Sequence, residues 1–269
     1  MYLLYCDESN LEEKDNDFFV YGGLAVEANA AVALSAAVEK IREDAGIAPD
    51  FVLKFNPGPK HLTHQEFSAV KQAVIQAAVQ HKAIFLASLI LHNVATSPDE
   101  ARRNAINTIC FHFDCLLSRP KSHGLVLIDR FEDKKIDGHL REKFSVGLTG
   151  LPYSEKMRLN RIIGFHYSAI GQSHFGSVID IVLGSFRFAV NAHTRQEQGK
   201  LPTAKTMLDL IAPLFFSENP KGLISEISLC FSPKVIKAAK YRTRYEQLKA
   251  FLSENAIVAE QSIVGERLF

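Results

Sequence analysis

The chain has 269 residues and a mass of 30.0 kDa, with 47% hydrophobic and 23% charged residues. These proportions are typical of a globular protein with a hydrophobic core, and they exclude disordered, collagen-like and disulfide-scaffold proteins. The formal net charge is +1, so overall electrostatic attraction alone would not draw the chain to nucleic acid or to an anionic membrane.

The apolar segments and the cysteines indicate in which cellular compartment the protein is expected. The longest nearly continuous apolar run, Ala83–Leu91, is far shorter than the roughly 20 residues that cross a bilayer. The segment Met1–Cys6 has no basic leader and meets Asp7 and Glu8 at once, which argues against a secretory signal. The four cysteines form no CxxC pair and no Cys/His finger spacing, which favours a reducing compartment and argues against structural zinc. We therefore expect a cytoplasmic protein with no membrane partner.

Charge is unevenly distributed along the chain. The first 27 residues contain seven acids and one base, whereas residues 134–161, beginning at Lys134, contain seven bases and three acids. Residues 233–249 add six bases against Glu246 alone. This segregation fits an acidic site flanked by a phosphate-attracting surface, and it equally fits two solvated helix or loop faces.

The N-terminal quarter predicts a hairpin followed by a helix. Tyr2–Ser9 and Phe18–Val26 are rich in strand-forming residues and are joined by a polar, acidic connection. Asn29 is a candidate cap for a helix that runs to about residue 44, and Gly46 is placed to end it in a left-handed turn. Phe51–Phe55 is a candidate short strand before a Pro/Gly turn.

Helices and strands then alternate. Thr63 and Glu66 form a capping-box pattern, and Ser97 followed by Pro98 and two acids is a second helix start. The further expected strands are Ala83–Leu91, Gly124–Asp129, Arg161–Ser168 and Leu223–Phe231. The further expected helices are Phe175–Val190, Thr203–Phe216 and a final basic helix over Pro233–Lys249. This order predicts an α/β sandwich with a mixed sheet, formed by one domain with a core in residues 1–190 and an extension in residues 200–269.

Three acids occupy positions where a structural residue would normally be apolar. Asp7 ends the first expected strand, Asp129 ends another, and Asp180 lies within the apolar helix sequence VIDIVL. A buried carboxylate must be paired, protonated or bound to a cation, because burying it alone costs several kcal/mol. If the three converge, they form an oxygen-only site suited to Mg²⁺ or Mn²⁺, and two such ions could support phosphodiester cleavage. The structural alternative is that Asp129 caps a turn or pairs with Arg130, and that Asp180 bonds a buried backbone group or a base.

Neighbouring residues are secondary candidates. Glu8 follows Asp7 on a strand, so the two should face opposite ways, whereas Ser9 shares the side of Asp7. Ser9 is therefore a candidate to support the site, and Glu8 is a candidate additional ligand. Lys54 could contact a phosphate or the acids, or it could be a solvated turn lysine. The chain has no GxSxG and no GxxxxGK[ST] motif, which excludes serine-hydrolase and P-loop readings.

Four short motifs together resemble a known family. The run YLLY followed by Cys6–Asn10 resembles the D-E-S-G opening of domain-of-unknown-function family 3800 (DUF3800), a bacterial and phage family placed with ribonuclease H-like folds. Leu53-Lys54 resembles its E-L-K segment, Leu127–Asp129 its central strand ending in Asp, and Ser168 with the helix through Asp180 its late S…Q-x-x-D helix. The resemblance spans Tyr2 to about Val190.

The resemblance implies a ribonuclease H-like mixed sheet flanked by helices and a nuclease-like site at Asp7, Asp129 and Asp180. Three positions depart from the family pattern: Asn10 replaces the motif glycine, Leu53 replaces a Glu, and Ser177 replaces a Gln.

Two functions are consistent with these features. One is a Mg²⁺- or Mn²⁺-dependent nuclease or phosphoryl-transfer enzyme whose basic stretches guide a nucleic-acid backbone. The other is a catalytically silent ribonuclease H-like module that binds nucleic acid or protein through residues 233–249, which the missing Glu at Leu53 favours.

Overall fold

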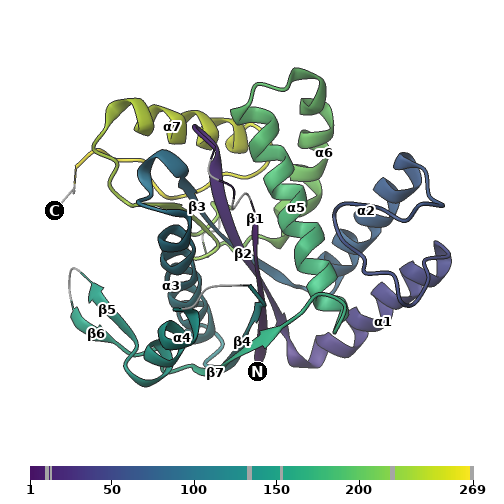
Figure 1. The fold of residues 1–269 in the computed structure, drawn as a ribbon, viewed down its shortest axis with the longest axis horizontal. Helices are drawn as coiled ribbons and strands as arrows, with labels where there is room; N and C mark the ends of the chain where they lie inside the picture. The colour runs from purple at the N-terminus through teal and green to yellow at the C-terminus, as the bar shows by residue number, and fades with distance from the viewer. Residues whose placement is uncertain (10–11, 13, 132–134, 152–153, 219–221, 267–269) are drawn as a thin grey trace.

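The computed structural model describes residues 1–9, 12, 14–131, 135–151, 154–218 and 222–266, so Asn10 and Lys134 lie outside the described residues. Its centre is one mixed sheet, with strand order β7-β4-β1-β2-β3-β8 (Figure 1). The strands are β1 (Tyr2–Ser9), β2 (Phe18–Glu27), β3 (Ile84–Leu91), β4 (Gly124–Asp129), β7 (Ile162–Ser168) and β8 (Leu229–Ser232). β2 is antiparallel to both β1 and β3, whereas β4 runs parallel to β1, β7 parallel to β4, and β8 parallel to β3. The expected α/β fold with a mixed sheet is confirmed.

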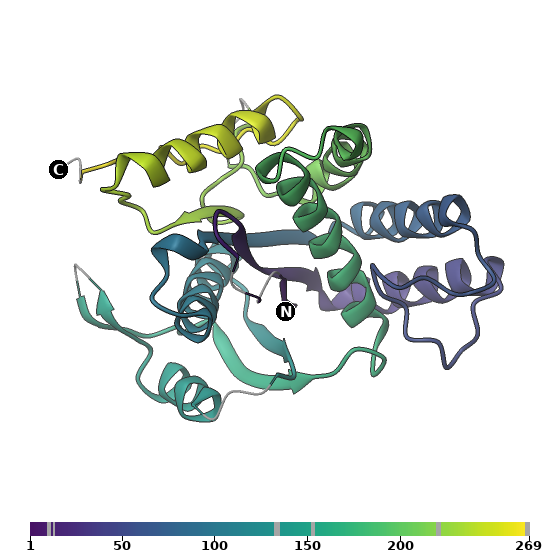
Figure 2. The ribbon, with the colours of Figure 1, turned by 45° about the horizontal axis from the view of Figure 1, so that its top comes forward.

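Helices cover both faces of this sheet (Figure 2). One face packs against α1 (Ala28–Asp44), α2 (His64–Gln80), α5 (His174–Thr194), α6 (Leu201–Ile211) and α7 (Ala239–Ser253). The other face packs against α3 (Pro98–Ser118) and α4 (Ile136–Ser145). Short 3₁₀ turns lie at His92–Val94, Gln198–Lys200 and Ala212–Leu214, and β5 (Leu148–Leu151) pairs with β6 (Ser154–Met157) in a separate hairpin.

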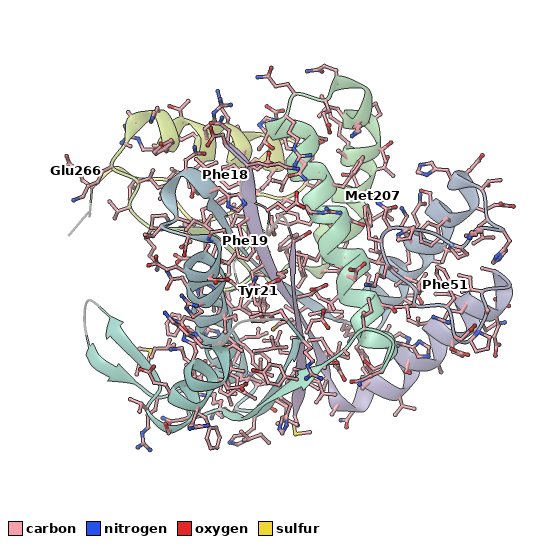
Figure 3. All side chains as sticks on the ribbon, viewed as in Figure 1. Phe18, Phe19, Tyr21, Phe51, Met207 and Glu266 are labelled. Carbon is pink, nitrogen blue, oxygen red and sulfur yellow. The ribbon has the colours of Figure 1, made fainter. Side chains whose placement is uncertain are left out.

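The period-two geometry of β2 explains the two cores. Successive strand side chains point to opposite faces, so Phe18 enters the core on the α5 side, whereas Phe19 and Tyr21 enter the core on the α3 side. All three residues are labelled in Figure 3. Nine of the ten residues of β2 are buried, which is the pattern of a strand covered on both faces.

Helix α5 is long and apolar enough to span a membrane, but 78% of its most apolar window is buried inside the protein. It packs directly on β1 and β2 and against α2, α6 and α7. Its apolar composition is therefore explained by its place at the centre of one helical layer.

Two helix starts agree with the sequence, and a third does not. The Thr63 side chain and the Glu66 carboxylate form the expected capping box, and the Ser97 hydroxyl accepts the Glu100 N–H at 3.2 Å. The cap predicted at Asn29 is wrong, because α1 begins at Ala28, directly after β2. The Ala28 N–H bonds the carbonyl of Met1, so the β1–β2 ladder runs up to the first residue of the helix.

The strand predicted at Phe51–Phe55 is wrong, because side chains bind its backbone in place of a neighbouring strand. The guanidinium of Arg42 donates to the carbonyls of Ala48, Pro49 and Phe51, the last at 2.9 Å. The N–H of Phe55 donates to the carboxylate of Asp180 at 2.5 Å.

The C-terminal elements are shorter than predicted. The last strand of the sheet begins only at Leu229, and the helix expected from Pro233 begins only at Ala239. Helix α4 and the β5–β6 hairpin were not predicted.

Candidate functional site

Two of the three predicted acids lie side by side at the carboxyl ends of neighbouring parallel strands. The register of β1 and β4 pairs Cys6 with Ile128, so Asp7 and Asp129 are the next residues on each strand. Asp129 in turn pairs with Ser168 at the end of β7. Cys6 and Ile128 belong to the core on the α3 side, so alternation directs Asp7 and Asp129 toward the layer that contains α5.

Asp180 approaches from the second turn of α5. Its carboxylate is held by the Phe55 N–H, and Phe55 itself packs against Gly184, where a Cβ atom would come within 2.5 Å of the ring. Asp7 and Asp180 both line a cavity of about 170 Å³, together with Ser9 and Arg187. A second, smaller hollow joins Asp7 to Asp129 and Ser168. The structure thus brings the three acids together around Asp7.

The acids perturb one another. Burial, followed by the negative charge of Asp180, raises the pKa of Asp7 from 3.8 to about 7, and Asp129 adds to this effect. Burial also raises the pKa of Asp129 and of Asp180. Within the part of the chain that the structure describes, no lysine or arginine nitrogen lies within 4.0 Å of any of the three carboxylates. The site is therefore a group of acids that are not neutralised by ion pairs.

Both structural alternatives for the single acids are also present. Asp129 accepts hydrogen bonds from the backbone at Arg130 and Ile170, and Asp180 accepts one from a backbone N–H. The Asp7 carboxylate accepts the N–H of Glu8 at 2.7 Å. These bonds hold each carboxylate in a fixed orientation and leave the remaining oxygen lone pairs free for another partner.

Two basic residues lie farther from the acids. The positive charge of Lys54 lowers the pKa of both Asp129 and Asp180, which places this candidate beside the cluster. Arg187 lowers the pKa of Asp180 as well, and its Nε atom is buried without a hydrogen-bond partner among the described residues. Arg187 was not predicted as a site residue from the sequence. The signal was its spacing, because Asp180, Gly184 and Arg187 lie on one helix face.

Glu8 is engaged elsewhere. Its carboxylate lies 2.7 Å from the Nε atom of buried Arg102, whose guanidinium stacks 4.2 Å from the Phe131 ring centroid. Glu8 borders the 170 Å³ cavity, but its charge is compensated by Arg102 on the side opposite to Asp7. Leu53, where the resembled family has Glu, is fully buried in the core and offers no ligand.

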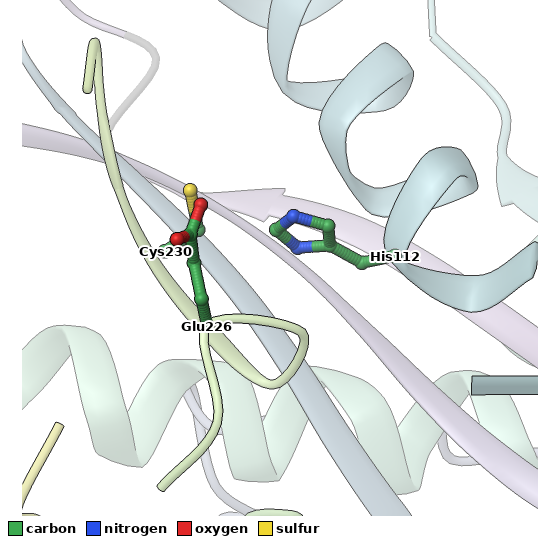
Figure 4. Close-up of side chains that lie close together, drawn as sticks. All are labelled: His112, Glu226 and Cys230. Atoms are coloured by element: carbon green, nitrogen blue, oxygen red, sulfur yellow. The ribbon is translucent and has the colours of Figure 1, made fainter. Parts of the chain in front are cut away.

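The structure contains a second group of side chains that could bind a metal ion, and this group was not predicted from the sequence. His112, Glu226 and Cys230 place one ligand atom each within 4.8 Å of the others (Figure 4). His112 is far along the chain from Glu226 and Cys230, so no local spacing motif could reveal the group. Asp114, two residues from His112, pairs with Arg161 at 3.0 Å and takes no part in it.

Comparison with protein-family models gives no match, and comparison with curated proteins gives none. The function is therefore inferred from the site itself.

Proposed function

We propose that this protein is a divalent-metal-dependent phosphodiester hydrolase that acts on nucleic acid and has a ribonuclease H-like fold. The observation that carries the proposal is the meeting of Asp7, Asp129 and Asp180 without an ion-pair partner among the described residues. The mixed sheet, in which β1 and β4 are adjacent parallel strands away from both edges, supports the fold assignment. Ligands in such sheets commonly bind outside the carboxyl ends of parallel strands, where Asp7 and Asp129 lie.

The donor set fits Mg²⁺ or Mn²⁺, because all three side chains offer hard oxygen ligands. The electrostatics fit as well, since the acids raise one another's pKa and a cation would remove their repulsion. When bound, such an ion would polarise a phosphate oxygen and lower the pKa of a bound water.

Arg187 and Lys54 would act on the substrate. Arg187 lines the cavity next to Asp180, and its guanidinium presents a planar set of donors that matches a phosphate. Lys54 supplies a point charge near Asp129 and Asp180. Together they would orient a phosphodiester against the acids, while Ser9 adds a hydroxyl to the same wall.

A catalytically silent nucleic-acid- or protein-binding module is the second candidate. It is favoured by two features of the site: Glu8 is compensated by Arg102, and a leucine, Leu53, stands where the resembled family has a Glu. In that case the site would bind a cation and a phosphate without turnover.

The test compares wild type with Asp180→Asn and Asp129→Asn on labelled single- and double-stranded DNA and RNA, in Mg²⁺, Mn²⁺ or EDTA. We expect metal-dependent cleavage that falls at least about 100-fold in either variant. The matched control is Asp209→Asn, an exposed aspartate on α6 that should leave cleavage unchanged.

Thermal unfolding separates the two candidates. Mn²⁺ should raise the melting temperature of wild type and not that of Asp180→Asn. A response to Mn²⁺ without cleavage of any nucleic acid would favour the binding module. If Mn²⁺ leaves the melting temperature unchanged and no nuclease signal depends on the acids, the proposed metal site is wrong.

A further inference from the structure

The cluster of His112, Glu226 and Cys230 lies apart from the acid site and goes beyond the proposed function. His112 is on α3, Glu226 is in the turn before β8, and Cys230 is the second residue of β8. Figure 4 shows the Glu226 carboxylate and the Cys230 sulfur on one side and the His112 ring facing them from the helix. His112 is 5% exposed and Cys230 is 3% exposed. The three donors therefore come from different segments and meet in a buried place.

The His112 ring has an unused nitrogen. Its Nδ1 atom is buried without a hydrogen-bond partner among the described residues. A buried polar atom without a partner costs about 1–3 kcal/mol, so such atoms are rare unless a ligand or water satisfies them.

The alternative interpretation of the cluster is a Glu226–Lys234 ion pair beside the buried thiol of Cys230. Lys234 lies 2.6 Å from the Glu226 carboxylate, but its side chain is 70% exposed. The Glu226 side chain is only 27% exposed, so the pair is half-buried, and a zinc ion would replace the exposed lysine as the charge partner of the carboxylate. The backbone of Glu226 is fixed independently, because its N–H donates to the Glu260 carboxylate at 2.7 Å. The carboxylate is therefore available to a cation.

We infer that His112, Glu226 and Cys230 bind one Zn²⁺ ion that links α3 to the β8 edge of the sheet. One imidazole nitrogen, one thiolate and one carboxylate are the three donor types that zinc accepts. In a tetrahedral site, the nitrogen and sulfur ligands are about 3.6 Å apart. The donors here lie within 4.8 Å of one another, so closing the site requires a contraction of little more than about 1 Å. The fourth position is open to a water.

The first test uses Co²⁺ as a spectroscopic substitute for zinc on the reduced, full-length protein. We expect one equivalent of Co²⁺ to give visible tetrahedral bands and a near-ultraviolet thiolate charge-transfer band, which one equivalent of Zn²⁺ then removes. The acid site contains no sulfur, so it cannot give the charge-transfer band, and Asp180→Asn should retain it. This separates the zinc site from the proposed metal site of the acids.

Variants assign the ligands. Cys230→Ala should abolish the charge-transfer band, and His112→Ala should weaken zinc binding by about tenfold or more. Cys110→Ala is the matched control, because Cys110 is another buried thiol of α3 outside the cluster, and it should bind zinc as wild type does. Absence of the band in wild type, or its persistence in Cys230→Ala, would overturn the inference. The wild-type spectrum decides the matter even if a variant fails to fold.

Discussion

Replacing Asp7 by asparagine should stabilise the metal-free protein at neutral and alkaline pH and have a much smaller effect in acid. The pKa of Asp7 is raised from 3.8 to about 7 in the folded state, chiefly by burial and by Asp180. A folded state that holds a proton more tightly than the unfolded state loses stability as pH rises between the two pKa values. Asparagine keeps the oxygen that accepts the Glu8 N–H and removes the charge.

The size of the effect follows from the shift. A displacement of about three pKa units corresponds to about 4 kcal/mol of lost stability above pH 8, because each unit is worth about 1.36 kcal/mol. At pH 5 only about 1.7 kcal/mol of this cost is present, so the advantage of Asp7→Asn should grow by about 2.6 kcal/mol between pH 5 and pH 8. For a chain of this size that is a relative gain of about 5–10 °C in melting temperature.

The assay is thermal and urea unfolding of wild type, Asp7→Asn and the exposed control Asp209→Asn in EDTA from pH 5 to pH 8. Subtracting the control removes the pH dependence of other groups, including Glu8, whose pKa burial also raises to about 7. An Asp7→Asn variant that is no more stable than wild type at pH 8, or whose advantage does not change with pH, would show that burial and Asp180 do not raise the pKa of Asp7.

Two further substitutions test how the fold supports the site and the sheet. Gly184→Ala should displace the Phe55 ring and with it the N–H that holds Asp180, so we expect a loss of about 1–3 kcal/mol and a weaker Mn²⁺ response, measured by thermal unfolding with and without metal. Tyr245→Phe should cost about 1–3 kcal/mol in urea unfolding, because the buried hydroxyl of Tyr245 accepts a backbone N–H of β3 and donates to a carbonyl of β8. An unchanged unfolding midpoint in either variant would contradict the corresponding contact.

Local signals in the sequence were enough to predict most strands of the sheet and most of its helices. The hairpin, the capping box at Thr63 and the strand that ends at Asp129 depend on residues a few positions apart, so periodicity and capping reveal them. The segment Phe51–Phe55 has a strand-like composition, but its backbone is bound by Arg42 and Asp180, and Asp180 lies 125 residues from Phe55. No local pattern records such long-range bonds.

In the candidate site too, some features are predictable from local sequence and others depend on long-range contacts. Asp7, Asp129 and Asp180 could be selected because each acid interrupts an apolar segment, and their meeting follows from the parallel register of β1 and β4. The pairing of Glu8 with Arg102 was not predictable, since it depends on how α3 packs against β1. The cysteine spacing predicted no zinc site for a similar reason, because spacing reflects only neighbours in the chain, whereas His112 and Cys230 become neighbours only in the folded protein.

The irregular conformation of the segment before α2 is directly linked to the geometry of the acid site. A strand at Phe51–Phe55 would use the Phe55 N–H in a ladder and leave the Asp180 carboxylate buried without a donor. Because the N–H is free of any ladder, it fixes one oxygen of Asp180, and Lys54 is carried to the edge of the cluster by the same turn. Gly184 permits this approach, since any larger residue would meet Phe55. A segment that lacks strand pairing and orients one carboxylate and one lysine is what the proposed cation- and phosphate-binding site requires.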